Sequence, residues 1–168
     1  MDITIRPVRP EDLDGVARLE AACFPPAEAA GKEEFARRIA AFPECFLVAE
    51  SAQGEIIGMI NGCVTDTTTL PDELYHDATL HQPDGPYQTV FGLDVLPEWR
   101  RQGIAARLME AFLDQARQRG KTGAILTCKD HLLHYYERFG YRCQGRSAST
   151  HGGAQWNDML LLFADENR

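Results

Sequence analysis

One stretch near the middle of the chain joins a hydrophobic strand to an amphipathic helix through a turn that carries two arginines. The strand is predicted over Tyr87–Val95, where apolar and less apolar residues alternate. The helix is predicted over Ile104–Arg119, because its apolar residues recur every three or four positions. The turn contains Arg100, Arg101, Gln102 and Gly103. A positively charged glycine turn therefore stands directly before a helix N-terminus.

Such a turn has the chemistry of an anion site. The first backbone N–H groups of the helix, those of Ile104, Ala105 and Ala106, have no carbonyl partner and lie at the positive end of the helix dipole. They favour a phosphate or diphosphate, and Gly103 lets an anion approach the backbone. An ordinary helix N-terminus with solvated arginines is the alternative. The turn has neither the G-x-x-x-x-G-K-[ST] nor the G-x-G-x-x-G pattern, which excludes the two commonest nucleotide motifs.

Length, charge and cysteines limit the class of protein. The chain has 168 residues, a length that predicts a single domain with one core over residues 1–168. The net charge of −8 argues against a nucleic-acid binder, and no segment has the length of a membrane span. The five cysteines are scattered and form no C-x-x-C pair, which indicates reduced thiols. We expect a soluble cytoplasmic protein, monomer or homodimer, that binds neither nucleic acid nor membranes.

The predicted elements follow a mixed α/β order. Strands are expected at residues 3–8, 46–51, 55–64, 87–95, 124–128, 141–146 and 156–163. Helices are expected at residues 13–23, 32–41, 104–119 and 131–139, and residues 66–86 form a long polar loop with room for a short helix. The predicted class is α/β, with a central, mostly antiparallel sheet of about seven strands flanked by about four helices.

The turn reads Arg-x-x-Gly-x-Ala from Arg100 to Ala105. This pattern resembles the Gln/Arg-x-x-Gly-x-Gly/Ala signature of the GNAT superfamily of acetyl-CoA-dependent N-acetyltransferases, and the order of elements is similar to the GNAT fold. The resemblance implies that the turn, Arg100 to Ala106, binds the pyrophosphate of acetyl-CoA, with no metal required. It also implies that the backbone N–H groups of Leu93, Asp94 and Val95 stabilise the oxyanion of the reacting thioester.

Further segments resemble the arylalkylamine N-acetyltransferases, and the likeness covers nearly the whole chain. Residues 126–141 look like the segment that carries a tyrosine general acid on a helix after the fifth strand. This likeness implies that Tyr136 protonates the leaving thiolate. Proton transfer from a phenol of pKa ~10 to a thiolate whose thiol has a pKa of ~8.5 is uphill by only ~2 kcal/mol. A core aromatic is the alternative for Tyr136, and the adjacent Tyr135 weakens any argument from one residue.

The base that deprotonates the amine is less defined. Vertebrate members of the subfamily use two histidines whose positions match Thr89 and Phe91, and neither side chain accepts a proton at neutral pH. Glu28 is the candidate base, because it lies in the loop that in this fold borders the acceptor and because insect relatives use a glutamate in that neighbourhood. Asp94 is a second candidate that could order a water. Simple solvation is the alternative for both carboxylates.

Three other features are weaker signals. His131 and His134 share a helical face but lack a third metal ligand, so surface or cap roles are expected. Cys128 lies on a predicted buried strand without an adjacent histidine, which favours direct transfer over an acyl-cysteine. Residues 66–84 carry five acids and no lysine or arginine, and this loop is either merely solvated or attracts cationic amines.

The resemblance implies an enzyme that transfers the acetyl group of acetyl-CoA directly to a primary amine of a small molecule, with arylalkylamines and polyamines as candidate acceptors. Two alternatives stay open. One is a peptide or protein N-acetyltransferase. The other is a non-catalytic acyl-CoA-binding domain, which needs the phosphate turn but no general acid.

Overall fold

The computed structural model describes residues 2–167 and divides the chain into two compact units. The first unit is Met1–Gly62 with Gly92–Phe112, and the second is Cys63–Phe91 with Leu113–Arg168. Helix α4 (Ile104–Gln118) contributes its residues up to Phe112 to the first unit and the remainder to the second. The single domain expected from chain length stays a prediction. Among the described residues, no helix combines the length and the apolar character needed to cross a membrane.

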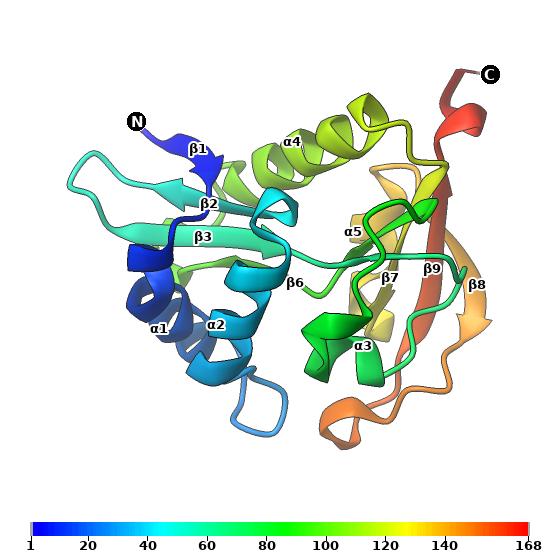
Figure 1. The fold of residues 1–168 in the computed structure, drawn as a ribbon, viewed down its shortest axis with the longest axis horizontal. Coiled ribbons are helices and arrows are strands. Elements are labelled where there is room, and N and C mark those ends of the chain that lie inside the picture. Colours follow the sequence, from blue (N-terminus) through cyan, green and yellow to red (C-terminus); the bar gives the residue numbers. More distant parts are fainter. Residues whose placement is uncertain (1, 168) are drawn as a thin grey trace. The chain divides into compact units, whose positions relative to one another are not determined.

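The first unit is an antiparallel sheet of four strands in the order β1-β2-β3-β6. Helices α1 and α2 cover one face of this sheet (Figure 1). The predicted helices at residues 13–23 and 32–41 are confirmed at both ends, and β6 is an edge strand of this sheet. The elements are β1 (Thr4–Pro7), α1 (Leu13–Cys23), α2 (Lys32–Ala41), β2 (Phe46–Glu50), β3 (Ile56–Asn61) and β6 (Gly92–Val95).

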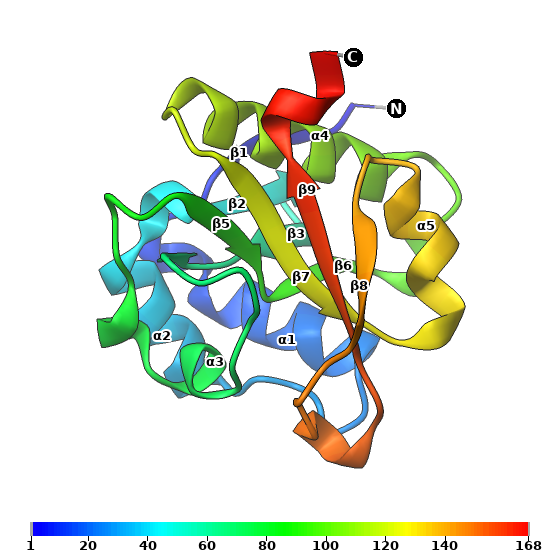
Figure 2. The same cartoon turned by 90° about the vertical axis from the view of Figure 1, so that its right-hand side faces the viewer.

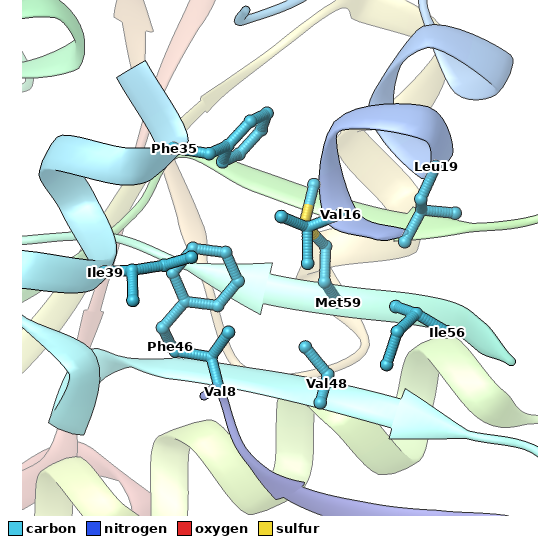
Figure 3. Close-up of a cluster of buried hydrophobic side chains, with 9 residues drawn as sticks. All are labelled: Val8, Val16, Leu19, Phe35, Ile39, Phe46, Val48, Ile56 and Met59. Carbon is cyan, nitrogen blue, oxygen red and sulfur yellow. The ribbon is translucent and has the colours of Figure 1, made fainter. Parts of the chain in front are cut away.

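An apolar core holds α1 and α2 against this sheet (Figure 3). The rings of Phe35 and Phe46 meet edge-on, with their centroids 6.2 Å apart. The other buried members are Val8, Val16, Leu19, Ile39, Val48, Ile56 and Met59. Glu20 also lies on the buried face of α1, one helical turn after Val16. A carboxylate on the face that packs the core is the exception in this helix.

The second unit is a mixed sheet of five strands in the order β4-β5-β7-β9-β8 (Figure 2). Strands β5 and β7 run parallel, and the other neighbours run antiparallel. Helix α3 lies within the long loop, where the sequence left room for a short helix. The elements are β4 (Val64–Thr65), α3 (Glu73–His76), β5 (Tyr87–Val90), β7 (Gly123–Cys128), α5 (Leu133–Glu137), β8 (Arg142–Arg146) and β9 (Asn157–Leu162).

Two predicted strands are each divided between the two sheets. Residues 87–95 form β5, which pairs with β7, and β6, which pairs with β3, with Phe91 between them. Residues 55–64 divide into β3 and β4 in the same way. At the break the Cys63 carbonyl accepts hydrogen bonds from the Thr89 N–H (2.9 Å), the Thr89 hydroxyl (2.9 Å) and the Gln88 side-chain amide (3.1 Å). Side chains thus supply hydrogen bonds to the backbone at the point where the regular strand pairing ends. The α/β class is confirmed, but the single sheet of about seven strands is replaced by sheets of four and five strands.

Candidate active site

The turn before α4 has a backbone shape suited to an anion. Arg101 and Gly103 both have left-handed φ angles, 65° and 78°. The Arg107 N–H donates to the Gly103 carbonyl (3.1 Å), so the N–H groups of Ile104, Ala105 and Ala106 precede the first helical donor. A Cβ on Gly103 would meet no atom within 4 Å, so the positive φ is the reason for glycine here. Successive amides next to left-handed residues form a concave set of donors for an anion.

The two arginines of the turn are used differently. The Arg100 Nε donates to the Val95 carbonyl (2.9 Å), which fastens the turn to the end of β6. Arg101 is exposed and, like the exposed Gln102 beside it, belongs to the turn itself. A left-handed conformation costs a side-chain-bearing residue about 1–2 kcal/mol. Strain of this kind at a non-glycine residue is typical of functional loops.

Strand β6 carries the three amides predicted to stabilise the oxyanion. The Leu96 N–H donates to the Ile57 carbonyl (2.9 Å), and antiparallel alternation then directs the Asp94 N–H toward β3. The N–H groups of Leu93 and Val95 point the other way, toward the open edge of the sheet. The Val95 carbonyl points to the same edge, where it accepts from Arg100 and from the Cys23 thiol (3.4 Å). Leu93 and Val95, rather than Asp94, are therefore the candidate donors.

The side chain of Asp94 forms a buried carboxyl pair with Glu20 of α1. Asp94 is 1% exposed and Glu20 is 7% exposed. No N–H or hydroxyl group of the described residues donates to either carboxyl oxygen of Asp94, whose side chain lies within hydrogen-bond reach of the Glu20 carboxyl group, whereas Glu20 Oε2 accepts from the Ala30 N–H (2.8 Å). Burial and the neighbouring Glu20 carboxylate raise the pKa of Asp94 well above its usual range. Sequence reasoning missed Glu20, although its spacing from Val16 places it on the buried stripe of α1.

Glu28, the predicted base, lies in the loop between α1 and α2. Its side chain is half-buried, and its N–H donates to the Pro25 carbonyl (2.9 Å). Two residues further on, the Ala30 N–H donates a hydrogen bond to the Glu20 side chain. The first unit thus contains the turn before α4, the open amides of β6, the carboxyl pair and the loop that carries Glu28.

Tyr136, the predicted acid, belongs to the second unit, on the short helix α5. Its half-buried ring contacts Tyr135 edge-on (5.2 Å between centroids) and Tyr141 (6.1 Å). Tyr141 is 1% exposed, and burial raises its pKa. Tyr141 is therefore the core aromatic of this segment. The predicted helix at 131–139 is shorter than expected, because the N–H groups of Phe139 and Gly140 bond three residues back and close a tighter turn.

The other sequence candidates lie in the second unit and have local partners. Thr89 is buried with its hydroxyl bonded to Cys63, and the Phe91 ring lies 4.9 Å from that of Tyr75. Burial raises the pKa of the Cys128 thiol to about 11, which makes it a poor nucleophile. His134 is exposed and lies 3.2 Å from Glu137, a surface position as expected.

Two acids of the loop at residues 66–84 have structural partners. Asp72 accepts from the Ser149 hydroxyl (2.5 Å), and Asp77 accepts from the Thr79 N–H (3.0 Å). Asp66, Glu73 and Asp84 are exposed. Asp77 is exposed as well, so four of the five acids match the solvated acidic loop that the sequence suggests and Asp72 is the exception.

A family model described as the acetyltransferase (GNAT) family matches residues 13–141, and the chain belongs to this family. The chain is 30% identical over 143 residues to the probable hydrolase YhcX of Bacillus subtilis (strain 168), a match that covers 80% of the chain and 27% of that protein. It is 30% identical over 108 residues to the serotonin N-acetyltransferase of Mesocricetus auratus, covering 64% of the chain and 51% of that enzyme. The chain therefore spans about half or less of the length of these relatives.

Solved structures support the same fold. The GNAT-like decarboxylase GphF in complex with isobutyryl-CoA superimposes with a TM-score of 0.79 at 23% sequence identity. The match covers 95% of this chain and 98% of that structure. The fold predicted from the order of elements is thereby confirmed as the GNAT fold.

The buried carboxyl of Asp94 makes a prediction for stability. Because its pKa is raised in the folded protein, the folded state holds the proton more tightly than the unfolded chain does. The free energy by which this proton binding favours the folded state is fully present below the unfolded pKa of about 3.9. It is lost as the pH rises toward the folded pKa. We expect Asp94→Asn to raise the free energy of unfolding at about pH 8 by on the order of 1 kcal/mol, and by less at about pH 5.

Urea unfolding at the two pH values measures this difference. The control is Glu33→Gln, which changes an exposed carboxylate on α2. An Asp94→Asn protein that loses stability equally at both pH values would contradict the assignment of a raised pKa.

Proposed function

We propose that this chain is an N-acetyltransferase that moves the acetyl group of acetyl-CoA directly to the primary amine of a small molecule. Its family and its likeness to a serotonin N-acetyltransferase support this proposal. The observation that carries it is the joining of two open-edge amides on β6 to a left-handed, arginine-bearing turn before α4. The proposal includes a single cytoplasmic domain, monomer or homodimer, and the five free cysteines are consistent with a reducing compartment.

The proposed cofactor site uses backbone more than side chains. The diphosphate of acetyl-CoA accepts hydrogen bonds from the first amides of α4, and the Arg101 guanidinium adds positive charge beside it. The thioester carbonyl then lies along the edge of β6, where the N–H groups of Leu93 and Val95 stabilise the oxyanion. The relative GphF was solved with an acyl-CoA, which supports the same class of cofactor for this chain.

The turn is tested by calorimetry with CoA. Arg101→Gln removes the charge, and Gly103→Ala places a Cβ on a residue with a φ of 78°. We expect each change to weaken CoA binding about ten-fold, which corresponds to about 1.4 kcal/mol. The control is Arg18→Gln, an exposed arginine on α1 of the same unit. Unchanged affinity in both turn variants would remove the turn from the cofactor site.

The proposed chemistry needs three groups. A base frees the amine, the β6 amides hold the oxyanion, and Tyr136 gives its proton to the leaving thiolate. Glu28 is the base that the likeness to insect relatives suggests. Cys128 is not required, because an un-ionised buried thiol is a poor acceptor of an acyl group.

Replacement of Tyr136 tests the general acid and the rival binding domain together. Tyr136→Phe keeps the ring but removes the proton donor, so we expect kcat to fall about 100-fold while CoA affinity stays unchanged. Tyr135→Phe is the matched control, since it removes a hydroxyl from the adjacent half-buried ring. A wild-type rate in Tyr136→Phe would exclude Tyr136 as the acid.

The acceptor is tested by measuring release of free CoA thiol with a panel of amines. We expect arylalkylamines and polyamines to react at least about ten-fold faster than peptides at equal concentration, because the proposed acceptor is small. Faster reaction with peptide amines would instead favour the protein-acetylating alternative. The absence of thiol release with every amine would favour a binding domain.

A further inference from the structure

The Asp94 carboxyl group is closed off from water and lies beside that of Glu20. Both carboxyl oxygens of Asp94 are buried, and Glu20 is 7% exposed. The backbone of Gly92 covers the pair from the β6 side, because a Cβ built there would lie 3.3 Å from Asp94 Oδ1 and 3.8 Å from Glu20 Oε1. An ionised Asp94 could gain water only if a neighbouring element moved away.

The groups that face Asp94 come from three elements of the first unit. From α1 they are Glu20 and Cys23, and from α2 the group is Arg38. On β3 the residue opposite Asp94 is Met59, which carries no charge. Arg38 therefore supplies the positive charge that faces the carboxyl pair.

That positive charge is engaged with other groups. The Arg38 guanidinium donates to Asn61 Oδ1 (3.0 Å) and lies 3.9 Å from Glu34. Arg100, in the turn before α4, interacts with the Cys23 thiol. Neither arginine donates to the buried carboxyl of β6. Two carboxyl groups in contact with so little compensation hold one proton between them.

The same pair is attached to the loop between α1 and α2. Glu20 Oε2 accepts from the Ala30 N–H (2.8 Å), near the end of the loop at residues 24–31. One helical turn after Glu20, the Cys23 thiol donates to the Val95 carbonyl (3.4 Å) at the open edge of β6. The contact between the two carboxyl groups thus lies where the last turn of α1 and this loop meet β6.

We propose that the Glu20–Asp94 pair is a proton-dependent latch: with one proton between them the two carboxyl groups hold the last turn of α1 and the loop at residues 24–31 on β6, and loss of that proton releases both. The latch itself does not require acetyl transfer. Its effect on catalysis rests on the proposed function, in which this loop carries the base Glu28 and the edge of β6 receives the thioester.

Loss of the proton turns an attraction into a repulsion. A protonated Asp94 donates a charge-assisted hydrogen bond to the Glu20 carboxylate. When both are ionised, two like charges are buried in contact, an arrangement that is relieved by admitting water. Earlier residues of the same helix, Val16 and Leu19, are fixed in the apolar core, and β6 is paired with β3. The part that can move is therefore the last turn of α1 with the loop at residues 24–31.

The sign of the pH dependence follows from the direction of the shift. Burial and the neighbouring Glu20 raise the pKa of Asp94. The latch is therefore closed over a pH range in which an ordinary carboxyl group is already ionised. The released form binds one proton fewer, so its population rises about ten-fold per pH unit above the apparent pKa of the pair.

The first test is hydrogen exchange of the Ala30 N–H, followed by NMR and expressed as protection relative to the intrinsic exchange rate at each pH. In wild type we expect this protection to be constant at low pH and to fall about ten-fold per pH unit above the apparent pKa of the pair. The internal reference is the Val8 N–H, which donates to the Phe46 carbonyl (2.9 Å) in the same unit. The protection of Val8 should not fall together with that of Ala30.

Three variants separate the latch from the titration of other carboxyl groups. Asp94→Asn has no proton to lose, so its Ala30 protection should not change with pH. Glu20→Gln removes the like charge but keeps a side-chain oxygen for the Ala30 N–H, and it should lose the pH dependence as well. Glu33→Gln, which changes an exposed carboxylate on α2, should behave as wild type.

The second test locates the proton by infrared spectroscopy. The spectrum of wild type minus that of Asp94→Asn should contain a protonated carboxyl band at about pH 6, where an ordinary carboxyl group is ionised. The band should disappear over the same pH range in which the Ala30 N–H loses protection. Both tests need only the folded protein, without acetyl-CoA or an amine.

The outcomes separate the latch from the proposed function. Ala30 protection that is constant with pH in wild type would overturn the latch, and so would an equal loss at Val8, which indicates unfolding of the whole unit. Absence of the carboxyl band at about pH 6 would overturn it too. Acetyl transfer by wild type in any of these cases would leave the N-acetyltransferase proposal intact. Joint loss of the band and of Ala30 protection in a protein that acetylates no amine would support the latch and refute the proposed function.

Discussion

The pairing of β6 with β3 is the constraint on which the rest of the first unit depends. Because that ladder fixes alternate residues, it directs the N–H groups of Leu93 and Val95 to the open edge. The same alternation turns the side chain of Asp94 toward α1, where Glu20 lies. The end of the strand is then tied to the turn through Arg100 and Val95. One hydrogen-bonding register therefore fixes the direction of the Leu93 and Val95 amides, the direction of the Asp94 side chain and the position of the turn before α4.

The Glu20–Asp94 carboxyl pair lowers folding stability, because it lies on a face of α1 that is otherwise apolar. Placing Glu20 one turn after Val16 puts a carboxyl group on the side of α1 that packs the core. A buried acid without donors lowers stability at neutral pH, and an apolar side chain of similar size would avoid that loss. Departures from the local rule are expected where function requires them. This cost falls at the edge of the four-stranded sheet, on the strand whose Leu93 and Val95 amides are open.

The features that could be predicted from the sequence are those that follow from the spacing of apolar residues and from prolines and glycines. The bounds of α1 and α2 and the turn before α4 follow from apolar spacing, prolines and glycines, and they were predicted to the residue or nearly so. The division of the strands at Cys63 and Phe91 was not predicted, because alternation of apolar residues continues through a change of pairing partner. Glu20 was missed because a carboxylate in a helix is ordinarily solvated, and its burial depends on β6, which is distant in sequence.

The structural role of Thr89 bears on where a base can lie. Its hydroxyl and its N–H both bond to the Cys63 carbonyl at the point where the strand changes sheets. A histidine there would remove the hydroxyl donor of this carbonyl, whereas the backbone N–H of residue 89 and the Gln88 side-chain amide would remain. The Thr89 hydroxyl therefore supports the strand break and is not a proton acceptor. Asp94 is the one ionisable residue that β6 contains, and its burial against Glu20 shows that the strand after the break places a carboxyl group in the core of the first unit.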